Sequence, residues 1–240
     1  MKNKVRRLIV ALLFLALPAS LLAQRSPAEV LKRIEKGFKK EKIKLNVELE
    51  GATAILTGQV RNVFAKNKAV EIALDQPEIE DIEADIEIAE AESADKLGQE
   101  VVKQIRRYGN LTIFDDASAF VKDGNIVLMG FVTEPYKKVG IEKRMHNVLG
   151  IQEFKNQIEV LPNSMQDARL RQTLANRLYR DSMFSDYARM AHPPIRIIVN
   201  RSRVLLTGVV LNKMAKQRAE SIIRQTLGVL SVESKLRFGS

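Results

Sequence analysis

The chain contains two histidines, His146 and His192, and no cysteine, so the side chains that most often hold transition metals are scarce. A zinc or iron site needs several converging ligands, and no ligand pattern surrounds either histidine. The absence of cysteine also excludes thiolate nucleophiles, iron–sulfur clusters and disulfides. We therefore expect no metal and no other cofactor.

The densest carboxylate pairs are Asp115 with Asp116 and Asp81 with Asp85. Two carboxylates act as general acid and base when their environments separate their pKa values. Asp81 and Asp85, however, alternate with apolar residues, which is typical of the solvated face of a strand. No nucleophile–base arrangement is evident elsewhere. We therefore expect a protein without enzymatic activity.

A predicted helix in the C-terminal third carries arginines on one side. Arg169, Arg177 and Arg180 fall within about 80° of helical arc, next to an apolar stripe. Arginines beside aromatic and apolar residues suit an anionic lipid surface, where each basic group adds about 1 kcal/mol of binding energy. A solvated basic helix that only covers a sheet is the alternative, and it stays open. The residues predicted to contact lipid are Arg169, Arg177, Arg180, Phe184, Tyr187, Arg189 and Met190.

The composition predicts a folded chain with an uneven charge distribution. Of its 240 residues, 45% are hydrophobic and 28% are charged, which excludes a disordered polymer. Residues 29–92 carry a net charge of −5, whereas residues 163–240 carry +9. The basic third lacks an interleaved aromatic platform, so we expect no nucleic-acid partner.

Residues 1–23 have the three-part organisation of a secretory signal peptide. A basic segment, Met1–Arg7, precedes an apolar run, Leu8–Leu17, and a region with small residues follows as far as Ala23, although Leu21 is larger than the residue usual at its position. The apolar run stops at Pro18 and is shorter than the ~20 residues that span a bilayer, so an uncleaved anchor is the less favoured alternative. Cleavage after Ala23 lowers the formal net charge from +10 to +6.

A short pattern, apolar-Leu-x-Gly-x-Val, recurs three times around Gly58, Gly130 and Gly208. Counted from each glycine, apolar residues recur in the same columns for the next 30 positions. Their spacing changes from four residues, which marks a helix face, to two, which marks a strand face. The chain therefore consists of repeats.

Each repeat is predicted to fold as helix–strand–strand–helix–strand. The crossover helix makes the third strand parallel to the second, so both helices cover one face of a mixed three-stranded sheet. The fold class is α+β. The predicted divisions are a signal peptide at 1–23 and three tandem units at 27–91, 93–162 and 165–238.

Five glycines in the repeats are assigned structural roles. A glycine inside a strand, as at Gly58, Gly130 and Gly208, usually allows a bulge or a closely packed helix. Gly150 and Gly228 follow predicted helices and are expected to cap them. The third unit departs from the pattern: it has Asn200–Arg203 where a turn glycine is expected, and it inserts Ser185–Pro194.

This pattern resembles the BON domain. The resemblance rests on Leu-x-Gly-x-Val in the second strand, followed by Leu149-Gly150-Ile151 or Leu227-Gly228-Val229, behind a signal peptide. In the first copy the second glycine is missing, and Pro77-Glu78-Ile79 stands in its place. The family implies a bacterial envelope protein without enzymatic activity, associated with osmotic-shock protection, outer-membrane integrity and phospholipid binding.

Two functions remain under this resemblance. In the first, the chain is a periplasmic protein that binds anionic phospholipid or a membrane surface reversibly, since it has no cysteine for lipid attachment. In the second, it is a protein-interaction or chaperone-like module whose partners are other envelope proteins, with the charge gradient orienting assembly.

Overall fold

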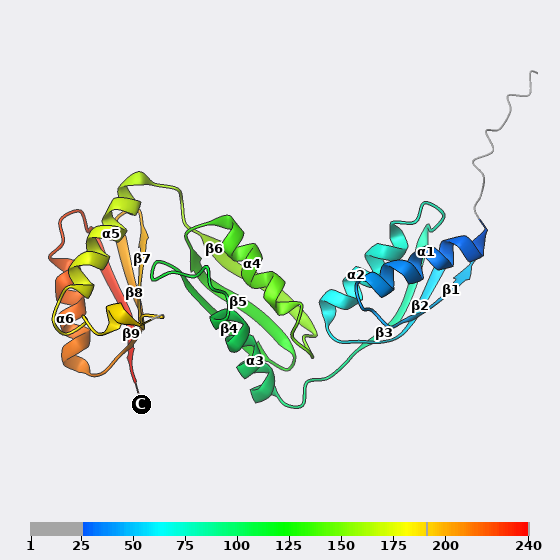
Figure 1. The fold of residues 1–240 in the computed structure, drawn as a ribbon, viewed down its shortest axis with the longest axis horizontal. Coiled ribbons are helices and arrows are strands. Elements are labelled where there is room, and N and C mark those ends of the chain that lie inside the picture. Colours follow the sequence, from blue (N-terminus) through cyan, green and yellow to red (C-terminus); the bar gives the residue numbers. More distant parts are fainter. Residues whose placement is uncertain (1–25, 191, 240) are drawn as a thin grey trace, which may run out of the picture.

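The computed structural model describes residues 26–190 and 192–239. The predicted signal peptide, residues 1–23, lies outside this part of the chain. The described residues form three α-β-β-α-β units that follow one another along an elongated molecule (Figure 1). We refer to residues 27–91 as unit 1, to residues 93–162 as unit 2 and to residues 165–238 as unit 3.

The three units share one order of elements, and unit 3 adds a 3-10 helix, η1, before its first strand. Unit 1 contains α1 (Pro27–Lys40), β1 (Asn46–Glu50), β2 (Thr53–Val60), α2 (Val63–Leu74) and β3 (Asp81–Ile88). Unit 2 contains α3 (Ala94–Arg106), β4 (Asp116–Lys122), β5 (Asn125–Val132), α4 (Pro135–Met145) and β6 (Glu153–Val160). Unit 3 contains α5 (Met165–Tyr179), η1 (Tyr187–Arg189), β7 (Ile195–Asn200), β8 (Arg203–Val210), α6 (Lys213–Arg224) and β9 (Ser231–Phe238).

Side-chain caps define where the helices begin. The opening helix of each unit follows a serine, Ser26, Ser93 or Ser164, whose hydroxyl accepts the backbone N–H three residues later. Helices α2 and α6 follow Asn62 and Asn212, which accept in the same way. These caps stabilise the helix starts because the first backbone N–H groups of a helix have no partner within it.

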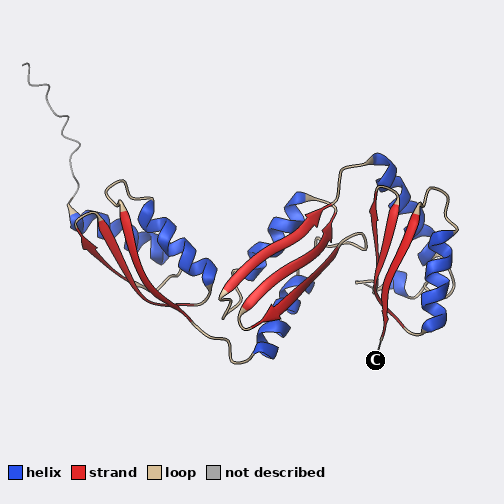
Figure 2. Ribbon diagram, turned by 180° about the vertical axis from the view of Figure 1, so that it is seen from behind, coloured by secondary structure: helices blue, strands red, loops and turns tan. Residues whose placement is uncertain are grey.

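Each sheet confirms the expected mixed topology. The middle strand is antiparallel to the first strand of its unit and parallel to the third. Both helices of a unit cover the same face of its sheet, and the other face is open (Figure 2). Each unit has its own apolar core, centred on a fully buried leucine of the middle strand, Leu56, Leu128 or Leu206. The α+β class is therefore confirmed.

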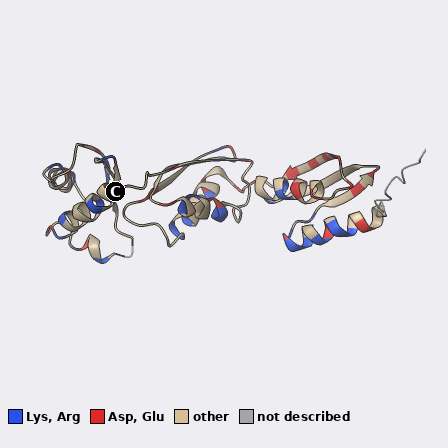
Figure 3. Ribbon diagram, turned by 90° about the horizontal axis from the view of Figure 1, so that it is seen from above, with Lys and Arg blue, Asp and Glu red and all other residues tan. Residues whose placement is uncertain are grey.

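The open face of unit 1 is acidic. Strand β3 turns its isoleucines toward the helices, so that Asp81 and Asp85 lie on the solvated side. Figure 3 shows acidic residues along the strands of this unit and basic residues along α1. The exposed acids of this face are Glu48, Glu50, Asp81, Glu83, Asp85 and Glu87.

The strand glycines adopt backbone conformations that other residues rarely adopt. The φ angles of Gly58, Gly130 and Gly208 are +123°, +123° and +109°. The parallel pairing with the third strand runs through Gly130 and Gly208 without a bulge. A Cβ atom at Gly208 would overlap the carbonyl oxygen of Pro194. The close approach is therefore made by the neighbouring chain segment, not by a helix.

We expect Gly208→Ala to lower the free energy of unfolding by about 1–3 kcal/mol, because it adds a Cβ to a left-handed residue against a backbone carbonyl. Gly98→Ala is the matched control, since Gly98 lies in α3 with no atom within 4 Å of its added Cβ. That change should raise stability by about 0.5–1 kcal/mol. Chemical unfolding of both variants measures the difference, and equal effects would refute the backbone role.

Gly150 and Gly228 are not helix caps, contrary to expectation. Helices α4 and α6 end before them, at Met145 and Arg224, with His146 and Gln225 as C-caps. Each glycine lies further on, in the loop that leads into the next strand, with φ of +85° and +94°. They allow this loop to turn, because a left-handed residue there carries no Cβ strain.

The hairpin turn of unit 3 has no glycine and is held by a buried carboxylate instead. Arg201 and Ser202 both have positive φ, 50° and 60°. The backbone N–H groups of these two residues donate to the side chain of Asp167, at 2.8 and 2.9 Å. The α5 carboxylate thus holds a turn that glycine would adopt without strain.

Candidate functional site

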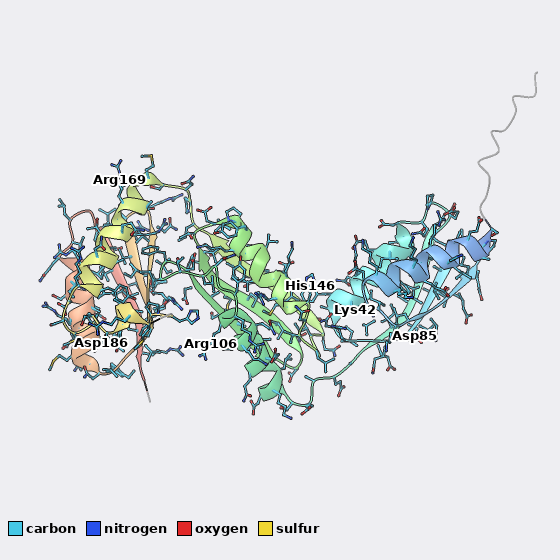
Figure 4. The ribbon with its side chains drawn as sticks, viewed as in Figure 1. Lys42, Asp85, Arg106, His146, Arg169 and Asp186 are labelled. Carbon is cyan, nitrogen blue, oxygen red and sulfur yellow. The ribbon has the colours of Figure 1, made fainter. Side chains whose placement is uncertain are left out.

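The arginines predicted to bind lipid lie on the outer face of α5. Arg169, Arg177 and Arg180 are all exposed, and Figure 4 places Arg169 near the start of the helix. Arg169 and Arg180 are about 16 Å apart along the axis, from the rise of 1.5 Å per residue. Arg177 donates a long hydrogen bond of 3.4 Å to the Gln225 carbonyl. Met165, at the start of α5, is 73% exposed and shares the face of Arg169.

The prediction that Phe184 contacts lipid is wrong. Its side chain is fully buried in the core of unit 3, and Tyr187 packs half-buried against the same core. The chain after α5 folds back in a turn, with the Phe184 N–H donating to the Asp181 carbonyl, and this directs the ring inward. Arg189 and Met190 are exposed, and Arg189 forms a long ion pair of 3.7 Å with Asp186.

Large apolar side chains are exposed at both ends of α6, and the sequence analysis missed them. Leu211 and Met214, at its start, are 76% and 68% exposed. Leu227 and Leu230, beyond its end, are 95% and 76% exposed. Leu211, Met214 and Leu230 fall between the columns that the three repeats share. Leu227 belongs to the shared Leu-Gly-Val motif, but the spacing of that motif does not show that the leucine is exposed.

Units 1 and 2 are joined by main-chain hydrogen bonds. We define the corner of unit 1 as Arg61–Phe64, where β2 leads into α2, and the loop of unit 2 as His146–Gln152, where α4 leads into β6. The Gly150 N–H donates to the Arg61 carbonyl, and the Val63 N–H donates to the Ile151 carbonyl, both at 2.8 Å.

Asn62 is at the centre of this junction and is fully buried. Its side-chain oxygen accepts the Ala65 N–H, and its amide nitrogen donates to the carbonyls of His146 and Val148, at 2.9 and 2.7 Å. One side chain therefore caps α2 and also satisfies two carbonyls of the neighbouring unit. In the sequence it resembles an ordinary helix cap.

Aromatic rings close the same junction. The ring of Phe64 stacks on His146, with centroids 4.2 Å apart, and lies 4.8 Å from that of Phe154. Burial lowers the pKa of His146; Glu142 raises it and Lys143 lowers it to a smaller extent. His146 thus has a structural position, in contact with another ring.

Units 2 and 3 meet differently, through the segment that precedes β4. The Ile197 N–H, on the outer edge of β7, donates to the Ile113 carbonyl at 2.7 Å. Ile113 and Phe114 pack against the core of unit 3. This segment covers part of a strand edge that otherwise has unpaired backbone groups.

A buried ion pair holds that segment in place. The Asp115 carboxylate and the Lys137 ammonium are both buried and 2.6 Å apart. Asp115 also accepts hydrogen bonds from the backbone N–H and the hydroxyl of Thr112 and of Thr133, at 2.7–2.9 Å. The pair Asp115–Asp116 is therefore no acid–base pair, because Asp115 is fully occupied by these donors.

Burial raises the pKa of Asp115, but the hydrogen bonds from Lys137, Thr133 and Thr112 outweigh it and hold that pKa below its ordinary value. A carboxylate with a lowered folded-state pKa stabilises the protein above its unfolded pKa of about 3.9. We therefore expect this contribution to be lost as the pH falls below about 4. The free energy of unfolding measured against pH should show a slope there, and Asp115→Asn should reduce that slope. An unchanged slope in this variant would contradict the prediction.

The remaining chemistry candidates are scattered. His192 is exposed after η1. Among residues 26–190 and 192–239, no group of three or more histidine, cysteine or acidic side chains is placed to hold a metal ion. In the same ranges, no helix is both long and apolar enough to cross a membrane.

A second cationic surface lies on unit 2. A shallow groove of about 750 Å³ follows α3 and reaches Val121 of β4. Lys103, Arg106 and Arg107 line it, and Val102 adds an exposed apolar side chain. This groove resembles the α5 face in charge but belongs to a different unit.

The described units therefore define a class of protein built from small α-β-β-α-β modules that contact one another. The profile of the BON domain family matches residues 27–90 and 166–240, which together exceed half of the chain. The chain belongs to the BON domain family. The family is associated with membrane and envelope functions.

The chain is also similar to two solved structures from Chlamydia trachomatis. One is CdsD, a structural protein of the type III secretion system, at 13% identity and a TM-score of 0.25, covering 88% of this chain and 92% of that chain. The other is the CdsD C-terminal domain, with the same identity and TM-score, covering 90% of this chain and all of that chain. No curated protein matches the sequence.

Proposed function

We propose that the chain is a non-enzymatic periplasmic protein that binds anionic phospholipid through α5 and supports the cell envelope under osmotic or envelope stress. The observation that carries this proposal is the exposed row of Arg169, Arg177 and Arg180, with exposed Met165 at the start of the same helix. The predicted signal peptide supports the location, and membership of the BON family supports the envelope role.

Binding through this face is electrostatic and reversible. Each arginine near an anionic surface contributes about 1 kcal/mol, and Met165 can insert one apolar side chain. Phe184 contributes nothing, since it is buried. Without an aromatic anchor, binding should depend strongly on anionic lipid content and on ionic strength.

We further propose that unit 2 is a third BON domain, although the family profile matches only the regions of units 1 and 3. Its element order, its mixed sheet and its positive-φ glycine at 130 are the same as in the other two units. This makes the chain a tandem of three related modules with diverged surfaces.

The test is co-sedimentation of residues 24–240 with vesicles of phosphatidylcholine, alone or mixed with phosphatidylglycerol. We expect binding to the mixed vesicles that weakens at high salt. Changing Arg169, Arg177 and Arg180 to Glu should lower the partition coefficient on the order of 100-fold, from about 1 kcal/mol per arginine.

The matched control changes Lys103, Arg106 and Arg107 to Glu, which alters the net charge equally on α3. This variant should retain binding. An equal loss of vesicle binding in both variants would show that the vesicles attract the overall positive charge of the chain and not α5 in particular. Absence of binding by the unmodified chain would refute the lipid function and favour a role in protein interaction.

A further inference from the structure

We propose that unit 3 associates end to end with unit 3 of a second copy of this chain, by repeating the contact that joins units 1 and 2. In that contact a corner docks on a loop. We define the corner of unit 3 as Leu211–Met214 and the loop of unit 3 as Arg224–Leu230. Both are exposed in the single chain, and the proposal does not depend on lipid binding.

The two corners are equivalent by sequence register and by structure. Asn62 and Asn212 each lie four residues after a repeat glycine, and each accepts a backbone N–H at the start of its helix. Phe64 and Met214 each lie two residues after that asparagine. The corner of unit 3 therefore presents the same backbone and the same amide as the corner that docks in unit 1.

The two loops are equivalent in the same way. Gly150 and Gly228 each lie twenty residues after a repeat glycine, and both have positive φ. The Leu230 N–H donates to the Ser202 carbonyl at 2.9 Å, as the Gln152 N–H donates to Gly124 at 2.9 Å. The loop of unit 3 thus shares its glycine conformation and this hydrogen bond with the loop that receives a corner in unit 2. Its Thr226 carbonyl also accepts a long hydrogen bond of 3.3 Å from the Val229 N–H, which leaves the second lone pair of that oxygen for a further donor.

The difference between the two pairs is burial. Asn62 is fully buried, whereas Asn212 is exposed, and among the described residues its amide nitrogen makes no hydrogen bond. Met214 is 68% exposed where its counterpart Phe64 is half-buried, and Leu227 is 95% exposed where its counterpart Leu149 is 49% exposed. Two exposed apolar side chains lie on each surface, Leu211 with Met214 and Leu227 with Leu230, and such groups mark interaction surfaces.

The other corner and the other loop in the chain cannot form this contact. Unit 2 has Glu134 and Pro135 at the positions of Asn62 and Val63, and proline has no N–H to donate. The loop of unit 1 has Glu78 in place of the glycine. Among the three described units, unit 3 alone has both a corner and a loop that can form this contact and are not already docked. We therefore assign the partner of each to unit 3 of a second copy.

The geometry requires a head-to-tail contact. The corner and the loop lie at opposite ends of α6, about 18 Å apart at 1.5 Å per residue over its 12 residues. The Asn212 amide would donate to the carbonyls of Arg224 and Thr226 of the second copy, and the Gly228 N–H of that copy would donate to the Leu211 carbonyl. A contact between different surfaces propagates, so the mass should grow beyond a dimer.

Salt should strengthen this association. Lys213 on the corner and Arg224 on the loop bring like charges together, and their repulsion is screened at high ionic strength. The apolar contacts of Leu211, Met214, Leu227 and Leu230 persist in salt. Lipid binding through α5 has the opposite salt dependence, so failure of one proposal can be distinguished from failure of the other.

Sedimentation velocity of residues 24–240 across a range of concentrations tests the proposal. We expect a mass that rises with concentration, and more steeply at high salt. Met214→Glu and Leu227→Glu alter exposed side chains, so both variants should fold. Met214 is the counterpart of Phe64, which packs against unit 2, and Leu227 is the counterpart of Leu149 in the receiving loop. Each variant alone should lower the association constant at least about tenfold, because it places a charge in a contact between apolar side chains.

Mixing the two variants gives the sharpest result. The Met214→Glu chain keeps an intact loop and the Leu227→Glu chain keeps an intact corner, so the mixture should form dimers that neither variant forms alone. Leu74→Glu, at an exposed leucine of α2, is the control and should associate like the unmodified chain. The proposal is overturned if the unmodified chain stays monomeric, if the mixture does not pair, or if Leu227→Glu lowers vesicle binding without changing the mass.

Discussion

Lys137→Met should lower the free energy of unfolding of unit 2 by about 3–5 kcal/mol, because it leaves the buried Asp115 carboxylate without its counter-ion. Methionine fills a similar volume, so the loss is chiefly electrostatic. Asp115 retains hydrogen bonds from Thr112 and Thr133, but these do not neutralise a buried charge. Chemical unfolding followed by circular dichroism measures the effect.

The same substitution should also loosen unit 3 from unit 2. Asp115 holds the segment whose Ile113 carbonyl accepts the Ile197 N–H. We expect faster hydrogen exchange at the Ile197 amide in the variant, in addition to the loss of stability. The exchange measurement separates this coupling from a general weakening, which would affect amides throughout unit 2 alone.

Lys68→Met is the matched control. Lys68 forms an ion pair of 2.8 Å with Glu71, but both side chains are largely exposed to solvent, so removal of this charge should leave the free energy of unfolding nearly unchanged. Adding Asp115→Asn to Lys137→Met should recover part of the loss, because the uncompensated charge disappears. A loss at position 137 no larger than at position 68 would contradict the buried-pair interpretation.

Asn62→Ala should destabilise the junction between units 1 and 2 by about 2–4 kcal/mol, the sum of two losses. The change removes the cap of α2, which contributes about 1 kcal/mol. It also leaves the buried carbonyl of Val148 and the part-buried carbonyl of His146 without this donor, at about 1–3 kcal/mol in total. We expect unit 1 to unfold separately from unit 2, which differential scanning calorimetry detects as an additional transition.

Asn212→Ala measures the effect of losing a helix cap alone, without the contacts of the junction. Asn212 caps α6 in the same geometry, but its amide is exposed within a single chain. At concentrations where the chain is monomeric, this change should cost only about 1 kcal/mol. Equal losses in the two variants would mean that the contacts with unit 2 add nothing to the cap.

Much of the fold follows from the sequence because periodicity is local. The columns shared after Gly58, Gly130 and Gly208 contain the change from helical to strand spacing, and the crossover helix determines the parallel pairing of the last strand. These signals recur at the same positions in all three units, so chance does not explain them. The α+β class and the mixed sheets could therefore be predicted from spacing alone.

The candidate site was predictable only in part. The arginines of α5 follow helical spacing, and their exposure agrees with it. Phe184 follows no period, since it lies in an irregular segment, and the direction of its ring depends on the turn at Asp181. An aromatic residue in such a segment packs inward or faces solvent according to contacts that spacing does not encode.

The repeats and the charge gradient are properties of neighbouring residues, and the sequence by itself determined them. The tertiary structure alone decided that Asn62 is a junction residue while Asn212 is exposed, and that Asp115 pairs with Lys137. Each of these outcomes depends on atoms from a distant part of the chain, whose placement sets burial and hydrogen-bond partners. Identical local caps thus acquire different roles because only one of them meets a neighbouring unit.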